Sequence, residues 1–156
     1  MPKHVLAKLE KDLKDIKQAL LVEIPQEIAR AAGQGDLSEN AEYEQALAKR
    51  DMYQNKMVVL EKRIAEVASM DISRLPKSRA AYGSEVTILD LDSEEEFTYK
   101  LVLPEELDGK SNHLSISSPI GSALVGQEEG SEVRVQIPAG LKRFEILELK
   151  TIHDVA

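Results

Sequence analysis

The sequence predicts an α+β protein in which an N-terminal antiparallel helical hairpin, of the coiled-coil type, precedes a small antiparallel sheet with one short helix. Apolar residues recur every three or four positions through roughly the first 70 residues, the period of an amphipathic helix. Beyond about residue 80 they alternate with polar residues, the period of a strand. Pro76, Ser78 and Gly83 interrupt the helical pattern between these regions. We therefore expect a helical domain over 1–75 and a sheet domain over 80–156.

The helical part is predicted to contain two long helices that bury apolar stripes against each other. The first stripe consists of Leu6, Leu9, Leu13, Ile16, Leu20, Ile24 and Ile28. The second consists of Tyr53, Met57, Leu60, Ile64 and Val67. Gly33 and Gly35 are poor helix formers that permit positive φ, so we expect the chain to reverse there. Pro25 removes a helical hydrogen bond and predicts a kink in the first helix.

The second half is predicted to form two hairpins, with a strand and a short helix between them. SEVTILDL and FTYKLVL flank the acidic run DSEEE, and VRVQI and LKRFEILEL flank the turn PAG. Both pairs alternate apolar and polar residues, as half-buried antiparallel strands do. HLSIS adds a further strand, and SPIGSALVG is typical of a short helix begun by serine and proline.

Composition and charge limit the possible functions. The 156 residues carry a net charge of −8, with 14 Lys and Arg against 13 Asp and Glu up to Arg79, and 6 against 15 from Ala80 onward. An acidic second half argues against a broad nucleic-acid surface there, because such surfaces use clustered Lys and Arg. The chain has no cysteine, hence neither disulfides nor thiolate metal sites. The charged N-terminus lacks the apolar core of a signal peptide and no apolar run is long enough to span a membrane, so we expect a cytoplasmic protein.

Few residues suggest catalysis by the chain itself. His4, His113 and His153 are scattered, with no carboxylate or serine at a spacing typical of a zinc site or a catalytic triad. The eight glycines form no phosphate-binding loop. We expect the histidines to be structural and do not expect a nucleotide-dependent enzyme.

An acidic cluster occupies the predicted turn, in the segment GQGDLSENAEYEQA at 33–46. Asp36 and Glu39 have the form of a capping box, in which the first caps the new helix and the second reaches back to it. The same pair on one helical face is also suited to a hard divalent cation, although two carboxylates need further oxygen ligands from another molecule. The residues alone leave both interpretations open.

The segment GDLSENAEY at 35–43 resembles the tip signature of the bacterial Gre transcript cleavage factors, GreA and GreB. The resemblance extends over nearly the whole chain, through YGSEVTILDLDSEEEFTYKLV, SISSPIGSALVG and VRVQIPAG. It implies a hairpin that enters the secondary channel of RNA polymerase and stimulates the polymerase to cleave nascent RNA in backtracked, arrested complexes. It also implies DNA binding, and an FKBP-like fold for the C-terminal domain.

The resemblance assigns roles to particular residues. Asp36 and Glu39 match the tip carboxylates that help to hold a second Mg²⁺ in the polymerase active centre, an ion shared with the polymerase. Polymerase contacts are implied at Ser118, Pro119, Ile120 and Gly121. Basic residues near the RNA 3′ end are implied at Lys49, Arg50 and Lys56, within a set that also includes Lys62 and Arg63. A serine and proline that merely begin a helix, and a solvated basic face, are the structural alternatives for these two groups.

The chain departs from the family pattern at a few positions. Val22 and Glu23 stand where a proline-glutamate pair is usual, with Pro25 about one turn later, so we expect the bend in the first helix to be displaced. Ala32 and Gln34 replace an arginine and a histidine common before the tip, which predicts weaker RNA contact and modest activity.

Other classes of protein remain as alternatives. One is a Gre-like regulator that binds the channel and inhibits without cleavage, although the intact Asp36 and Glu39 argue against it. Others are a coiled-coil adaptor and a prolyl isomerase. An isomerase pocket is normally lined by aromatic side chains, and the chain has six Phe and Tyr in all.

Overall fold

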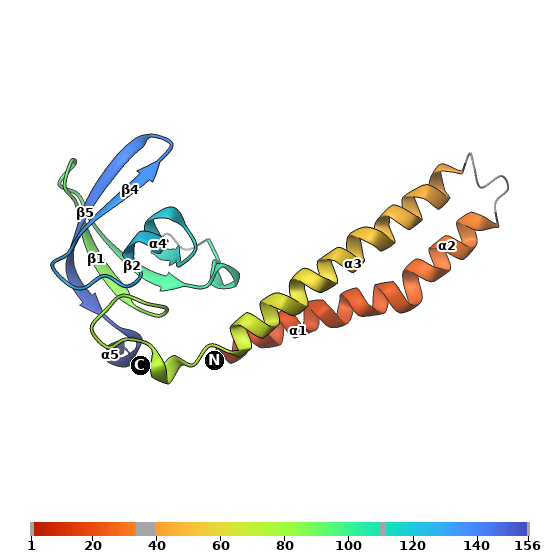
Figure 1. The fold of residues 1–156 in the computed structure, drawn as a ribbon, viewed down its shortest axis with the longest axis horizontal. Helices are drawn as coiled ribbons and strands as arrows, with labels where there is room; N and C mark the ends of the chain where they lie inside the picture. The colour runs from red at the N-terminus through yellow and green to blue at the C-terminus, as the bar shows by residue number, and fades with distance from the viewer. Residues whose placement is uncertain (1, 34–39, 110–111, 156) are drawn as a thin grey trace. The chain divides into compact units, whose positions relative to one another are not determined.

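The computed structural model describes residues 2–33, 40–109 and 112–155. They form two compact units, Met1–Ile72 and Ser73–Ala156. Figure 1 shows a helical hairpin as the first and a curled sheet as the second. Within the described ranges, no helix combines the length and the apolar character needed to cross a membrane.

The first unit is an antiparallel helical hairpin, as predicted. One arm runs through α1 (Lys3–Gln18), the π-helical turn η1 (Ala19–Glu23) and α2 (Ile24–Ala32). The other arm is α3 (Ala41–Ala68), which packs along both α1 and α2. Every residue of the two predicted apolar stripes is buried or half-buried. The helical period therefore identified the faces that pack together.

A π-helical turn precedes Pro25 in the first arm. Ile24 N–H donates to Ala19 O, five residues back, in place of the usual four. Pro25 is the second residue of α2 and has no N–H to donate to the preceding turn, yet the helix continues through this junction. The arm changes direction at this junction (Figure 1). The bend expected from Pro25 thus coincides with a π turn, which the sequence analysis did not anticipate.

The second unit contains a five-stranded sheet in the order β3-β2-β1-β5-β4. Both predicted hairpins are confirmed: β1 (Glu85–Asp90) pairs antiparallel with β2 (Glu96–Val102), and β4 (Glu132–Ile137) with β5 (Gly140–Lys150). Strand β5 also pairs antiparallel with β1. The short strand β3 (His113–Ser115) departs from the antiparallel expectation, since it pairs parallel with β2.

Short helices complete the second unit. The predicted helix is α4 (Pro119–Leu124), and α5 (Ile152–Val155) follows β5 at the C-terminus, an element that the sequence analysis did not predict. Two 3₁₀ turns, η3 (Ile72–Arg74) and η4 (Pro104–Glu106), lie in the connections. Leu124 of α4 joins the alternating strand residues in one continuous core, which includes Val86, Ile88, Leu101 and Ile146.

Candidate functional site at the hairpin tip and the α4 turn

The hairpin tip lies between the end of α2 and the start of α3. Gly33 is the C-cap of α2, and its N–H donates to Ala29 O and Arg30 O. Asp36 and Glu39, the predicted metal-binding carboxylates, lie outside the described residues. Their roles therefore stay predictions, but the residues on either side define how the two arms meet.

Asn40 is the N-cap of α3. Its Oδ1 accepts from Tyr43 N–H at 3.1 Å, and its Nδ2 donates to Ala31 O at the end of α2. The sequence analysis did not assign this cap to Asn40, and the capping role considered for Asp36 lies outside the described residues. Asparagine caps a helix about as well as aspartate, but it also has an N–H group that can donate across the tip. The amide therefore joins the two arms, whereas a carboxylate offers only acceptors.

The predicted basic residues lie on α3 beyond the tip. Lys49 Nζ contacts Glu27 on α2 at 3.0 and 3.3 Å, and Lys49 and Lys56 lie 5.8 and 5.4 Å from the centroid of the Tyr53 ring. Arg50 contacts its neighbour Asp51 at 3.5 Å. The structure thus groups Lys49 and Lys56 around one aromatic ring and directs Arg50 to a separate carboxylate.

Glu27 stabilises the charged form of Lys49. The hydrogen bond from its ammonium to Glu27 raises the pKa of Lys49 above its ordinary value. The pair is about one-third exposed, with side chains 38% and 36% accessible. Lys49 therefore serves first as a tie between the arms, and Lys56, which is exposed, is the more accessible cation of the two.

Two residues important near the tip were missed by the sequence analysis. Glu27 became recognisable as a partner of Lys49 only once the register of the hairpin was known. Tyr53 was assigned to the apolar stripe, and it is half-buried there while it also contacts both lysines. Asn40 did carry a sequence signal, because asparagine is a preferred N-cap, but Asp36 competed for the same role.

The turn that begins α4 is built by serines. Ser118 Oγ accepts from Gly121 N–H at 3.0 Å and donates to Ser115 O at 2.7 Å. Pro119 follows as the first helical residue, where its fixed φ suits a helix start. The structural interpretation of this motif is therefore confirmed, independently of any contact with a partner.

The predicted polymerase-contact residues differ in accessibility. Pro119 is exposed, Ser118 and Ile120 are half-buried, and Gly121 is buried. Ile120 packs against the sheet core, and a Cβ at Gly121 would lie 1.9 Å from Ser115 O. Pro119 thus presents the most accessible surface of the four, while Gly121 is needed for the close approach of the backbone.

Two of the three histidines have structural contacts in the second unit. His153 Nε2 donates to Leu75 O at 2.8 Å, and His113 Nδ1 lies 3.5 Å from Asp108. Within the described ranges, no three His, Cys, Asp or Glu side chains are grouped so that they could hold a metal ion.

Two family models cover the chain and place it in the class of transcription elongation factors. "Transcription elongation factor, N-terminal" matches residues 1–68, and "Transcription elongation factor, GreA/GreB, C-term" matches residues 75–151. The two matches fall on the helical hairpin and on the sheet unit. The chain belongs to the GreA/GreB family.

Individual relatives agree with the family models. The chain is 39% identical over 143 residues to the transcription elongation factor GreA of Hyphomonas neptunium, covering 92% of this chain and 91% of that protein. It is 36% identical over 150 residues to GreA of Pelobacter propionicus, covering 96% and 95%. A solved GreA/GreB structure from Nitrosomonas europaea is 32% identical and covers 58% of this chain and 78% of its own, with a TM-score of 0.43.

Proposed function

We propose that this transcription elongation factor inserts its hairpin tip into the secondary channel of RNA polymerase and stimulates the polymerase to cleave nascent RNA in backtracked complexes. Its site of action is then the cytoplasm, with RNA polymerase and the RNA 3′ end as its partners. The proposal rests on family membership and on the position of Asp36 and Glu39 between two long helices. The bond-breaking reaction belongs to the polymerase.

The cross-tip hydrogen bonding of Asn40 is the structural observation that supports the proposal. It ties the start of α3 to the end of α2, so the connecting segment with both carboxylates is closed at its base. The 28 residues of α3 extend about 42 Å at 1.5 Å per residue. A hairpin of this length whose connecting segment contains Asp36 and Glu39 is suited to reach a site inside another protein.

The residue chemistry fits a shared metal ion. A second Mg²⁺ in the polymerase active centre would activate water for hydrolysis of the RNA phosphodiester. Asp36 and Glu39 would contribute hard carboxylate oxygens to it, while the polymerase supplies the remaining ligands. We expect no tight Mg²⁺ binding by the chain alone, because two carboxylates are too few for a strong site.

The basic residues have a secondary role in this proposal. Lys56 would lie near the RNA 3′ end, where an exposed cation favours phosphate. Lys49 would contribute less, because Glu27 already compensates its charge. Arg50 would also contribute less than Lys56, because Asp51 compensates its charge.

The test is an RNA release assay on stalled, backtracked complexes. Asp36→Asn and Glu39→Gln should each lower stimulated cleavage by about 100-fold, by analogy with the loss expected when a metal site is perturbed, while polymerase binding stays nearly intact. Glu44→Gln is the matched control, since it removes one negative charge from an exposed position in the first turn of α3. Wild-type activity in Asp36→Asn would contradict the metal role, and polymerase inhibition without cleavage by the wild type would indicate the regulator instead.

A second arm of the assay tests docking at the α4 turn. Pro119→Asp places a charge on the exposed residue and still suits a helix N-terminus, so α4 should form. We expect weaker polymerase binding, with cleavage recovering at high protein concentration. Pro138→Asp, in the exposed turn between β4 and β5, is the control. Unchanged binding by Pro119→Asp would indicate that the polymerase contacts another part of the second unit.

A further inference from the structure

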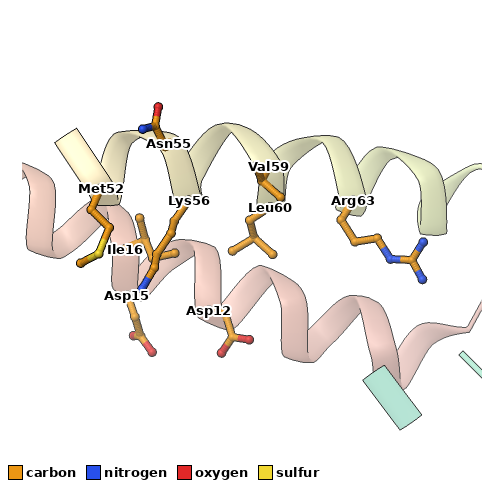
Figure 2. A pocket seen from close by; sticks show the side chains of 9 residues that line it. All are labelled: Asp12, Asp15, Ile16, Met52, Asn55, Lys56, Val59, Leu60 and Arg63. Atoms are coloured by element: carbon orange, nitrogen blue, oxygen red, sulfur yellow. The ribbon is translucent and has the colours of Figure 1, made fainter. Parts of the chain in front are cut away.

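An open groove runs along one face of the hairpin, between α1 and α3, with a volume of about 770 Å³. Its apolar lining comes from Ile16, Met52, Val59 and Leu60. Val59 is 68% exposed and Met52 47%, which is unusual for large apolar side chains grouped on one face. Figure 2 shows Met52 and Leu60 directed from α3 toward α1, with Ile16 between the helices. The hairpin therefore retains apolar surface beyond the stripe that its own helices bury.

The two walls of this groove carry opposite charges. Asp12 and Asp15 lie on α1, while Lys56 and Arg63 lie on α3 (Figure 2). Arg63 also pairs with Glu66 on its own helix at 3.2 Å, so Lys56 is the principal cation of the wall. A helix that covers the groove must match an acidic side on α1 and a basic side on α3.

We propose that the groove binds a second copy of this chain, so that two hairpins associate side by side and in parallel. A two-fold axis along the groove places α1 of one copy opposite α3 of the other. Asp12 and Asp15 of each copy then face Lys56 of the other, and the apolar linings meet between them. An axis across the groove would instead oppose acid to acid and base to base, so the charges select the parallel arrangement.

The association is weak and reversible. The groove extends over Met52–Arg63 of α3, about 17 Å of helix at 1.5 Å per residue. Such a contact is smaller than a standard interface of about 800 Å² per partner, so we expect a dissociation constant on the order of 10⁻⁵ M. The net charge of −8 on each copy opposes association as well.

The pairing has a consequence for regulation. A hairpin that is covered along this face by a second hairpin is about twice as wide as a single one. Self-association would therefore cover Lys56 and the apolar lining at high concentration, and dilution would expose them again.

The test is sedimentation equilibrium of the full chain from about 5 to about 500 µM, a range that spans the expected midpoint. The wild type should shift from monomer to dimer, and Val59→Glu should raise the dissociation constant at least about tenfold, since it buries a charge in the apolar lining. Val58→Glu is the matched control, because Val58 is 65% exposed on the same helix but does not line the groove. A wild type that stays monomeric throughout, or equal effects of the two substitutions, would overturn the proposal.

A charge-reversal experiment tests whether the charged walls of the two copies pair. Asp12→Lys with Asp15→Lys makes both walls basic, and Lys56→Glu with Arg63→Glu makes both acidic. Each double variant should fail to self-associate at physiological salt, but an equimolar mixture should form heterodimers, because each groove then meets one of opposite charge. Circular dichroism of each variant verifies that the helices form. Failure of the mixture to associate, with both variants folded, would rule out the pairing of oppositely charged walls.

Discussion

The hairpin and the sheet unit are stabilised in different ways. Among the largest fully buried side chains of the described residues, only Ile24 and Val67 belong to the hairpin, and the remainder belong to the sheet unit. The hairpin relies on one seam of mainly half-buried residues together with polar ties such as Glu27–Lys49. The sheet unit has a continuous core of strand residues and Leu124.

This difference separates the determinants of folding from those of function. A two-helix seam leaves most of each helix exposed, so surface residues there can change with little effect on stability. In the sheet unit, by contrast, the predicted docking turn is held by the core and by Gly121. We expect substitutions in the hairpin to affect activity more than stability, and substitutions at the α4 turn to affect both.

The largest effect should come from removing a core side chain of the sheet unit. Leu101 is fully buried, and Leu101→Ala should lower the free energy of unfolding by about 3 kcal/mol. Leu20→Ala, at a half-buried seam position, should cost only about 1 kcal/mol. Hydrogen exchange of the full chain measures each unit separately. Equal losses of unfolding free energy from the two substitutions would contradict the proposal that the two units are stabilised differently.

A somewhat smaller effect is expected at the α4 turn. Gly121→Ala would place a Cβ 1.9 Å from Ser115 O and 2.8 Å from Ser118 Oγ, so the turn must shift, at a cost of about 2 kcal/mol. Gly126→Ala is the comparison, since Gly126 has positive φ but open space around it, and should cost about 1 kcal/mol. Thermal unfolding measures both. A larger loss from Gly126→Ala would mean that steric contact at Gly121 is unimportant.

At the tip, Asn40→Ala should cost about 1 kcal/mol through loss of the N-cap. Asn40→Asp keeps the cap but removes the donor to Ala31 O, so it should affect cross-tip closure alone. We expect both variants to lower stimulated cleavage and only the alanine variant to increase exchange of the first amides of α3. Full cleavage activity in both would show that closure of the tip by Asn40 is not required.

The smallest expected effect depends on pH. Asp90 accepts from the N–H groups of Asp92 and Ser93, and these bonds, with Lys142, lower the pKa of its carboxyl group. The folded state therefore favours the ionised form, and this stabilisation is present above the ordinary pKa of about 3.9 and lost as the pH falls through the folded pKa. Asp90→Asn should lower the melting temperature at pH 7 but have little effect near pH 2. A constant difference across that range would exclude a role of the charge.

Regular periodicity made most of the fold predictable from the sequence. The seam from Leu6 to Ile28 and the alternation in β1, β2, β4 and β5 identify the buried faces directly. The direction of β3 was not predictable, because three residues carry too little pattern to show how a strand pairs. The π turn was not predictable either, since one extra residue in a helix leaves almost the same apolar spacing.

The candidate site was predictable to a lesser degree. The motif identified Asp36 and Glu39, and it located the α4 turn through Ser118 and Pro119. The tie between Glu27 and Lys49 depends on the register of two arms that are distant in sequence, which spacing along one helix does not reveal. The cap at Asn40 was not predicted, because several polar residues between Asp36 and Asn40 can cap a helix and spacing alone does not choose among them.

The π turn η1 also sets the rotation of α2 about the axis of the first arm. One additional residue within a helical turn rotates everything beyond it by about 100° around the helix axis. Deleting one residue from Ala19–Glu23 would therefore turn a different face of α2 toward α3 and move Glu27 away from Lys49. A single insertion or deletion in this turn would thus change the orientation of α2 without altering any residue of α2 itself.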